Sequence, residues 1–108
     1  MPQPPEISPE QRRAALEKAK AVRRERAAVK ERLKSADVSI GSVIADREDS
    51  EVVAKMRVVD LLESMPGVGK VRARQIMERL QIAESRRVRG LGAKQIAALE
   101  VEFAAGEA

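Results

Sequence analysis

The apolar residues of this chain are almost all aliphatic, and this limits the cores that it can form. Hydrophobic residues make up 44% of the 108 residues, yet Phe103 is the only aromatic one. The core must therefore consist of valine, leucine, isoleucine, methionine and alanine, which favours helices packed through small side chains. No segment alternates between apolar and polar residues for long enough to indicate a β-strand. We predict an all-α fold with one modest core.

Helix start signals divide the chain into a long amino-terminal helix and a compact helical part. Ser8, Pro9 and Gln11 form the pattern of a capping box, and good helix formers continue to about Lys34. The later helices are predicted after Ser39, after Ser50, from Val58 to Ser64, from Gly69 to Gln81 and from about Ala93 to Ala104. The apolar seam of the long helix is narrow and rich in alanine, so its amino-terminal half should project from the body. The three prolines within residues 1–7 predict a disordered tail.

The residue types that are absent argue against catalysis. The chain has no cysteine and no histidine, which excludes disulfides, thiolate and imidazole metal sites, and histidine acid–base chemistry. The acidic residues between Asp46 and Glu51 lack the spacing of a calcium loop and are interpreted as a solvated connection directed away from any anionic partner. Ser39, Ser50 and Ser85 are interpreted as helix caps and not as nucleophiles. We therefore expect a binding protein without catalytic residues, metal or cofactor.

The distribution of charge indicates an anionic partner. The net charge is +4, and the segment from Pro66 to Lys94 contains eight basic and two acidic residues. A localised basic segment attracts a polyanion, of which nucleic acid is the commonest. Proteins that bind single strands usually stack bases on aromatic side chains, so the lone Phe103 favours a double strand. The apolar runs are short, and we expect a cytoplasmic protein that does not enter a membrane.

The sequence MPGVGKVRARQIM, from Met65 to Met77, places a tight turn directly before a basic helix. Pro66 would fix the angle at which the chain enters the turn. Gly67 and Gly69 would allow positive φ angles and the close approach of another chain, while Val68 would anchor the turn in the core. The alternative interpretation is a purely structural connection between two helices.

Basic residues accompany this turn and follow the next helix. The amides at the start of the helix, with its dipole behind them, would form a phosphate site surrounded by Lys70, Arg72 and Arg74. On the same helix, Val71 and Arg72 are expected on the flanks. A second basic turn consists of Arg86, Arg87 and Arg89. A helix with a basic turn at each end could straddle a groove of a duplex.

The long amino-terminal helix is also dense in charge. Lys18, Lys20, Arg23 and Arg24 cluster where acidic residues are fewest. A run of charge on a helix is most often a solvated face, and the alternative is a second surface for the same polyanion.

Long strings of the sequence resemble the actinobacterial integration host factors. These strings are SPEQRRAALEKA near the start, KMRVVDLLESMPGVGKVRARQIMERL in the middle and SRRVRGLG near the end. The carboxy-terminal half also resembles the helix-two-turn-helix of a small-subunit ribosomal protein. The residues that carry this second similarity are Gly67 to Lys70, Ala73, Ile76, Ile82 to Glu84, and Leu91 to Ile96.

The family resemblance implies a small helical nucleoid protein that binds and bends double-stranded DNA with low sequence preference. We expect the protein to be a monomer, with a long basic helix at 8–34 and a compact DNA-binding domain at 35–108 that contains the helix-two-turn-helix at about 58–104. The DNA-binding residues that it implies are Pro66, Gly67, Val68, Gly69, Lys70, Arg72 and Arg74, then Arg86, Arg87 and Arg89, and on the long helix Arg23 and Arg24. Pro66 would press on the duplex. Contacts with topoisomerase or recombination machinery stay open, and RNA binding on the ribosome through the same motif is the alternative function.

Overall fold

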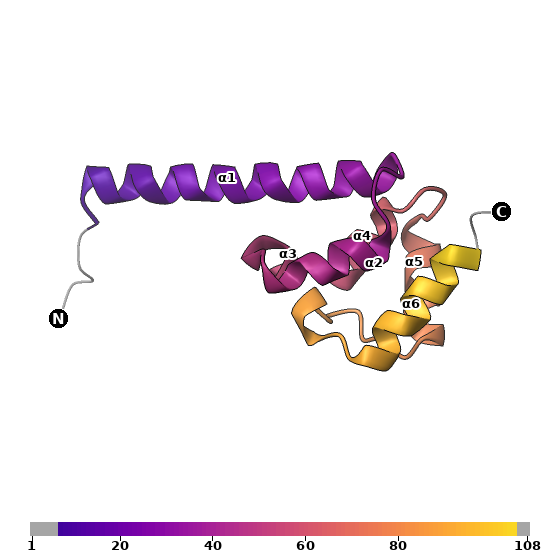
Figure 1. Ribbon diagram of the computed structural model, residues 1–108. Helices are drawn as coiled ribbons and strands as arrows, with labels where there is room; N and C mark the ends of the chain where they lie inside the picture. Colours follow the sequence, from indigo (N-terminus) through magenta and orange to yellow (C-terminus); the bar gives the residue numbers. More distant parts are fainter. Residues whose placement is uncertain (1–6, 106–108) are drawn as a thin grey trace.

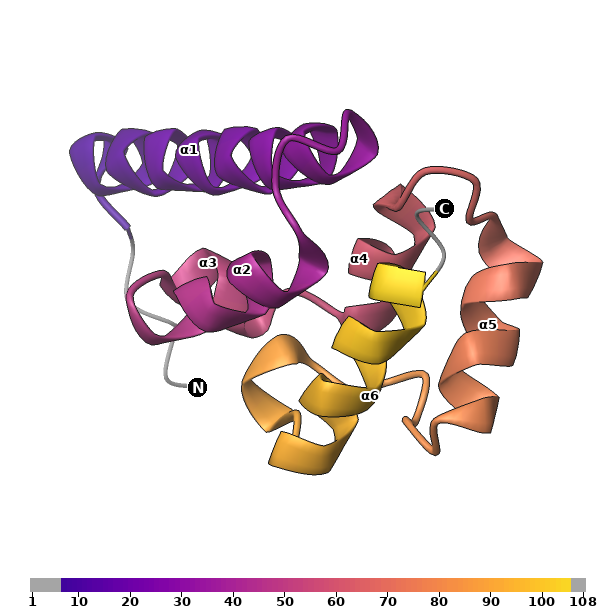
Figure 2. The same ribbon diagram turned by 45° about the vertical axis from the view of Figure 1, so that its right-hand side comes forward.

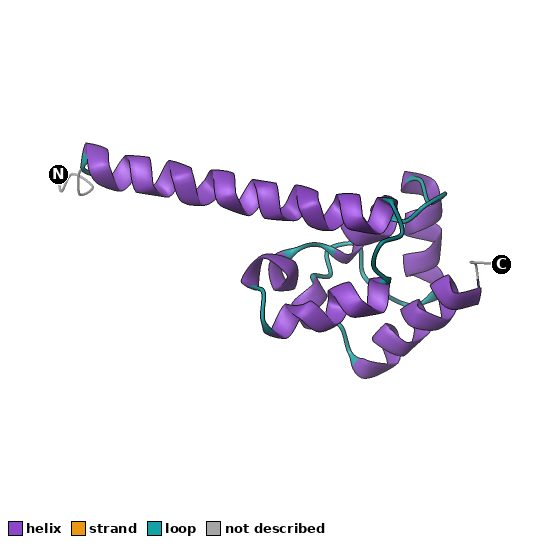
Figure 3. Cartoon of the chain, turned by 45° about the horizontal axis from the view of Figure 1, so that its top comes forward, coloured by secondary structure: helices purple, strands orange, loops and turns teal. Residues whose placement is uncertain are grey.

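The computed structural model describes residues 7–105, and within that range it contains helices and no β-strand (Figures 1 and 3). The α-helices are α1 (Pro9–Lys34), α2 (Ile40–Ala45), α3 (Glu51–Lys55), α4 (Val58–Ser64), α5 (Lys70–Arg79) and α6 (Ala93–Ala105), and the 3-10 helices are η1 (Asp46–Glu48) and η2 (Val88–Gly90). The prediction of an all-α fold is confirmed. Of the tail predicted at residues 1–7, residues 1–6 lie outside the described range.

Serine side chains begin three of the helices. Ser8 accepts a hydrogen bond from the amide of Gln11, whose side chain accepts one from the Ser8 amide, so the predicted capping box is present. Ser39 and Ser50 cap α2 and α3 in the simpler way, through one amide each. The same prediction for Ser85 is wrong, because the next element, η2, begins after Arg87 and has no side-chain cap.

The helices α1 and α5 both end through a residue in the left-handed conformation. At the end of α5, Gln81 has a φ of 59°, and the amide of Ile82 donates to the carbonyl of Met77 at 2.8 Å. Ala36, with a φ of 60°, occupies the equivalent place after α1. This is the Schellman arrangement, here without the usual glycine. It ends α5 at Arg79, before the predicted end at Gln81.

The helix α1 is docked at its carboxy-terminal end, and the rest of it extends past the body (Figures 1 and 3). Val29 and Leu33 are its buried residues, and Val22 is half-buried. The Ser50 hydroxyl lies 3.5 Å from the Glu25 carboxylate, which places this part of α1 beside the start of α3. The predicted projection of the amino-terminal half is therefore confirmed.

The helices α2 to α6 and the carboxy-terminal end of α1 surround one aliphatic core. Its largest fully buried side chains are Leu33, Ile44, Leu61, Leu62, Ile76, Met77 and Leu99. Phe103 packs at the edge and is half-buried. Outside the core, Nη1 and Nη2 of Arg79 donate to the Glu102 carboxylate at 2.8 and 2.6 Å, which ties α5 to α6. The same hydrogen bonds lower the pKa of Glu102 below its usual value. None of the described helices is both long and apolar enough to cross a membrane.

Candidate nucleic-acid interface

The turn before α5 is a type II turn whose special residue is Gly67. The amide of Val68 donates to the carbonyl of Met65 at 3.1 Å, and Gly67 has a φ of 75°. Proline at the second position and glycine at the third are the residues that this turn favours. Pro66 and Gly67 are exposed, whereas Val68 is 7% exposed and anchors the turn in the core as predicted.

The prediction of a positive φ at Gly69 is wrong. This residue has φ −93° and ψ −175°, an extended conformation that any residue adopts. The type II turn needs a single left-handed residue, and Gly67 already supplies it. A Cβ atom built on Gly69 would have no neighbour within 4 Å, so the missing side chain leaves open a space outside the protein.

The helix α5 begins with three backbone amides that its own residues do not engage. The first intrahelical hydrogen bond runs from the Ala73 amide to the Gly69 carbonyl at 2.9 Å. The amides of Lys70, Val71 and Arg72 precede it, and Gly69 offers them no side-chain acceptor. The serine-capped helices differ in this respect. The start of α5 is therefore suited to an external anion, which its dipole also favours.

The basic side chains around this start are exposed, but two of them lie near acids. Lys70, Arg72 and Arg74 are all exposed. Arg74 forms an ion pair with Glu84 at 3.1 Å. Arg72 lines a hollow that also includes Pro66 and Glu102. Val71, expected on a flank of the helix, is 70% exposed.

The second basic turn is fixed by backbone contacts with the segment before α4. The amide of Val58 donates to the carbonyl of Arg86, and the amide of Val88 to that of Met56, both at 2.9 Å, forming an antiparallel bridge between Arg57 and Arg87. Val88 is fully buried beneath the turn. The three arginines Arg86, Arg87 and Arg89 are exposed around it.

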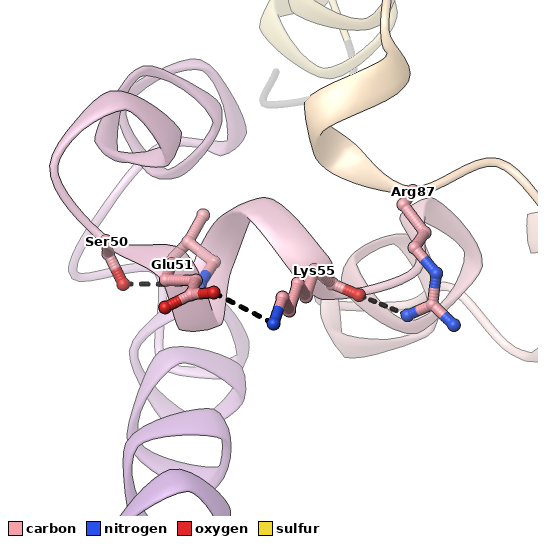
Figure 4. A network of polar contacts seen from close by, with 5 residues as sticks. Ser50, Glu51, Lys55 and Arg87 are labelled. Atoms are coloured by element: carbon pink, nitrogen blue, oxygen red, sulfur yellow. Dashed lines mark hydrogen bonds and ion pairs between the residues drawn. The ribbon is translucent and has the colours of Figure 1, made fainter.

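Side chains complete the support of this turn. Arg47 donates from Nη1 to the carbonyls of Val88 and Leu91 at 3.1 and 3.2 Å. Arg86 donates to the Gly90 carbonyl at 3.1 Å. Arg87 donates to the Lys55 carbonyl, as Figure 4 shows. Arg47, Arg86 and Arg87 therefore help to hold the backbone from which Arg89 projects.

The bridge adds basic residues that the sequence analysis missed. Arg57 and Lys55 are exposed and lie beside Arg87, although they precede it by about 30 residues. No local pattern in the sequence connects these residues. Only the fold makes them part of the same basic surface.

The acidic connection is exposed at Asp46, Glu48, Asp49 and Glu51, but Glu51 is paired with a basic residue. Glu51 forms an ion pair with Lys55 at 2.8 Å, in the network of Figure 4. The hydrogen bond from Lys55 lowers the pKa of the Glu51 carboxyl, and the charges of Lys18 and Arg89 lower it further. Glu51 therefore lies among basic residues of α1, α3 and the second turn, and does not point away from them.

The two arginines proposed on α1 do not share its packed side. The side of α1 that packs on the body carries Val22, Val29 and Leu33, and Glu25 lies there beside Ser50. The charge of Lys18 acts on Glu51 at the start of α3, while Arg23 and Arg24 are exposed. In Figures 1 and 2 the turn before α5 and η2 lie at separate corners of the body.

Comparison with known families and structures gives a consistent result. The model of the S13-like H2TH domain matches residues 33–103. The integration host factor of Streptomyces coelicolor is 65% identical over 99 residues, which cover 92% of each chain. The integration host factors of Mycolicibacterium smegmatis and Mycobacterium tuberculosis are each 52% identical over 99 residues, covering 92% of this chain and 94% of theirs.

A solved structure of sIHF bound to an 8 bp palindromic DNA is similar in fold as well as in sequence. Its TM-score is 0.79 and its identity is 64%, and the match covers 81% of this chain and 98% of the other. Both the turn before α5 and the turn of η2 lie within the residues that the family model matches.

Proposed function

Because this chain belongs to the integration host factor family of Streptomyces and the mycobacteria, we propose that it is a nucleoid protein that binds double-stranded DNA with low sequence preference and bends it. The complex of sIHF with DNA, 64% identical, supports DNA as the partner. The observation that carries the mode of binding is the start of α5, where three amides, a bare glycine and exposed basic side chains occur together.

The proposed grip has two parts that both address the phosphate backbone. A phosphate approaches the amides of Lys70 to Arg72 over Gly69, where no side chain stands in its way. Arg86, Arg87 and Arg89 hold a second stretch of backbone, with Arg57 beside them. Contacts of this kind position a duplex without reading its sequence.

Bending follows from holding one duplex at two separate places. The two turns lie at different corners of a body held together by its core. A straight duplex therefore has to bend in order to contact both turns at once. Pro66, exposed at the tip of the type II turn, presses on the duplex at the first of these places. We further propose that the protein acts as a monomer in the nucleoid, where topoisomerases and recombinases meet the DNA that it has bent.

A titration of labelled duplexes by fluorescence anisotropy tests this function. Two DNA duplexes of unrelated sequence should bind alike, and log K should fall with log salt concentration with a slope of about −4 to −7, as about five to eight neutralised phosphates would give. A matched RNA duplex should bind more weakly. Strong preference for one DNA sequence would contradict the phosphate grip.

RNA binding is the second candidate, because the matching family model is that of an S13-like domain. In that case the RNA duplex would bind more tightly than both DNAs in the same titration. The protein should then also be found in ribosomal fractions.

Reversing Arg23 and Arg24 to glutamate tests whether α1 touches the DNA. Both side chains are exposed on the solvent side of α1, so the change should leave the fold intact. If the helix lies along the duplex, we expect at least a tenfold loss of affinity, because four units of charge change at the backbone. The control is the same reversal at Arg12 and Arg13, nearer to the end of the helix. Unchanged affinity in the Arg23 and Arg24 variant would assign this part of α1 to solvent.

A further inference from the structure

One apolar side chain stands in the middle of the proposed phosphate site. Four large apolar side chains are exposed among the described residues: Ile7, Leu16, Val71 and Val101. The first two belong to the projecting amino-terminal region, and Val101 lies on α6. Val71 is the most exposed, at 70%, and lies in the first turn of α5 between Lys70 and Arg72.

Neither the core nor the helix explains a valine at this place. The core side of α5 is formed by Ala73, Ile76 and Met77, and Val71 points away from it. β-branched residues are weaker helix formers than alanine or lysine, so α5 gains nothing from valine in an exposed position. Isolated apolar residues on a surface are ordinary. What sets Val71 apart is that its own amide is one of the three directed at the incoming phosphate.

A nucleic-acid strand whose phosphate binds at these amides also brings its neighbouring sugars against the side chain of Val71. Each backbone phosphate lies between two sugar rings, and the methyl groups of Val71 are attached one residue into the helix whose amides receive the phosphate. The carbon edge of a deoxyribose is apolar and can pack on these methyl groups. In RNA the 2′-hydroxyl occupies this edge, and a methyl group offers it no hydrogen-bond partner in place of water.

We propose that Val71 is a specificity-determining residue that contacts deoxyribose and disfavours RNA at the α5 site. This rests on the proposed DNA-binding function and deepens it, because it names the feature of the nucleic acid that the site distinguishes. A contact with a single phosphate cannot separate DNA from RNA, since both carry the same phosphate group. A non-polar side chain at the sugar can.

The test compares the affinities of the wild-type protein and of Val71→Thr for matched DNA and RNA duplexes of one sequence. Threonine has nearly the shape of valine and a similar helix propensity, but it adds a hydroxyl that can pair with a 2′-hydroxyl. The ratio of RNA to DNA dissociation constants should fall about three- to tenfold in this variant. The difference in shape between the two duplexes is the same for both proteins, so it cancels when the ratios are compared.

Val101→Thr is the matched control, because Val101 is 67% exposed and lies on α6, outside the site. Its ratio should equal that of the wild type. A ratio unchanged in Val71→Thr, or one that Val101→Thr alters equally, would overturn the role of Val71 while leaving DNA binding intact. Failure of the wild-type protein to bind DNA would instead refute the proposed function itself.

Discussion

Replacing Gly69 with valine should reduce the affinity for duplex DNA at least tenfold while the protein stays folded. The fold has no need of glycine here, because the backbone is extended and a Cβ atom would meet no protein atom within 4 Å. In the proposed grip, the space that the side chain would occupy is the space through which a phosphate reaches the amides of Lys70 to Arg72. Losing even one hydrogen bond between an amide and a charged phosphate costs about 1.5 kcal/mol, and 1.4 kcal/mol is a tenfold change.

Two measurements make this result interpretable. Thermal unfolding should show Gly69→Val to be about as stable as the wild type, whereas substitution of Gly67, with its φ of 75°, should destabilise the turn. Lys70→Ala should lose less affinity than Gly69→Val, since it removes one mobile charge and leaves the amides open. Full DNA affinity in a folded Gly69→Val protein would exclude the amide site.

Replacing Arg86, Arg87 and Arg89 together with alanine should weaken binding about 100-fold or more, and equally for unrelated sequences. Each arginine can form a charge-assisted hydrogen bond to a phosphate, worth about 1.5 kcal/mol or more. Because three cations leave the interface, the slope of log K against log salt should become shallower by about 2.7. Salt-dependent anisotropy titrations with two DNA sequences measure both effects.

The triple alanine variant needs a control that keeps the three positive charges. Arg86 and Arg87 also donate to the carbonyls of Gly90 and Lys55, so their loss can loosen the turn as well as remove charge. The triple change to lysine keeps the charges, and it should keep the salt slope while losing only part of the affinity. Arg89→Ala alone should make the slope of log K against log salt shallower by about one. A loss confined to one DNA sequence would indicate base reading instead of phosphate contacts.

The local signals in this sequence were enough to predict most of the helices. Ser8, Ser39 and Ser50 begin helices as expected, since a cap depends on residues three positions apart. The end of α5 was harder to predict, because Gln81 takes the left-handed conformation that glycine usually occupies. The positive φ predicted at Gly69 was wrong for a related reason. Both Gly67 and Gly69 could accept a positive φ, and only the closing hydrogen bond of the turn shows which of them does.

The basic surface was predictable in part, for a different reason. Lys70, Arg72, Arg74 and the second turn are contiguous runs and are visible in the sequence. Arg57 joins the surface through a backbone bridge to Arg87, and Arg47 supports it from within an acidic segment. Such partners are separated by 30 to 44 positions, and only packing of the core brings them together. Periodicity cannot reveal contacts of this kind.

The helix α1 is held near one end only, so a small change in its angle moves its free end. Its contacts with the body run from Val22, through Glu25, to Leu33. The 13 helical residues before Val22 span about 20 Å, so a tilt of about 10° at Val22 would move the tip by about 3 Å. The core, packed around Leu33, need not rearrange for a motion of this size. If α1 lies along the duplex as proposed, such a tilt would let it follow duplexes of different curvature while the two turns keep their spacing.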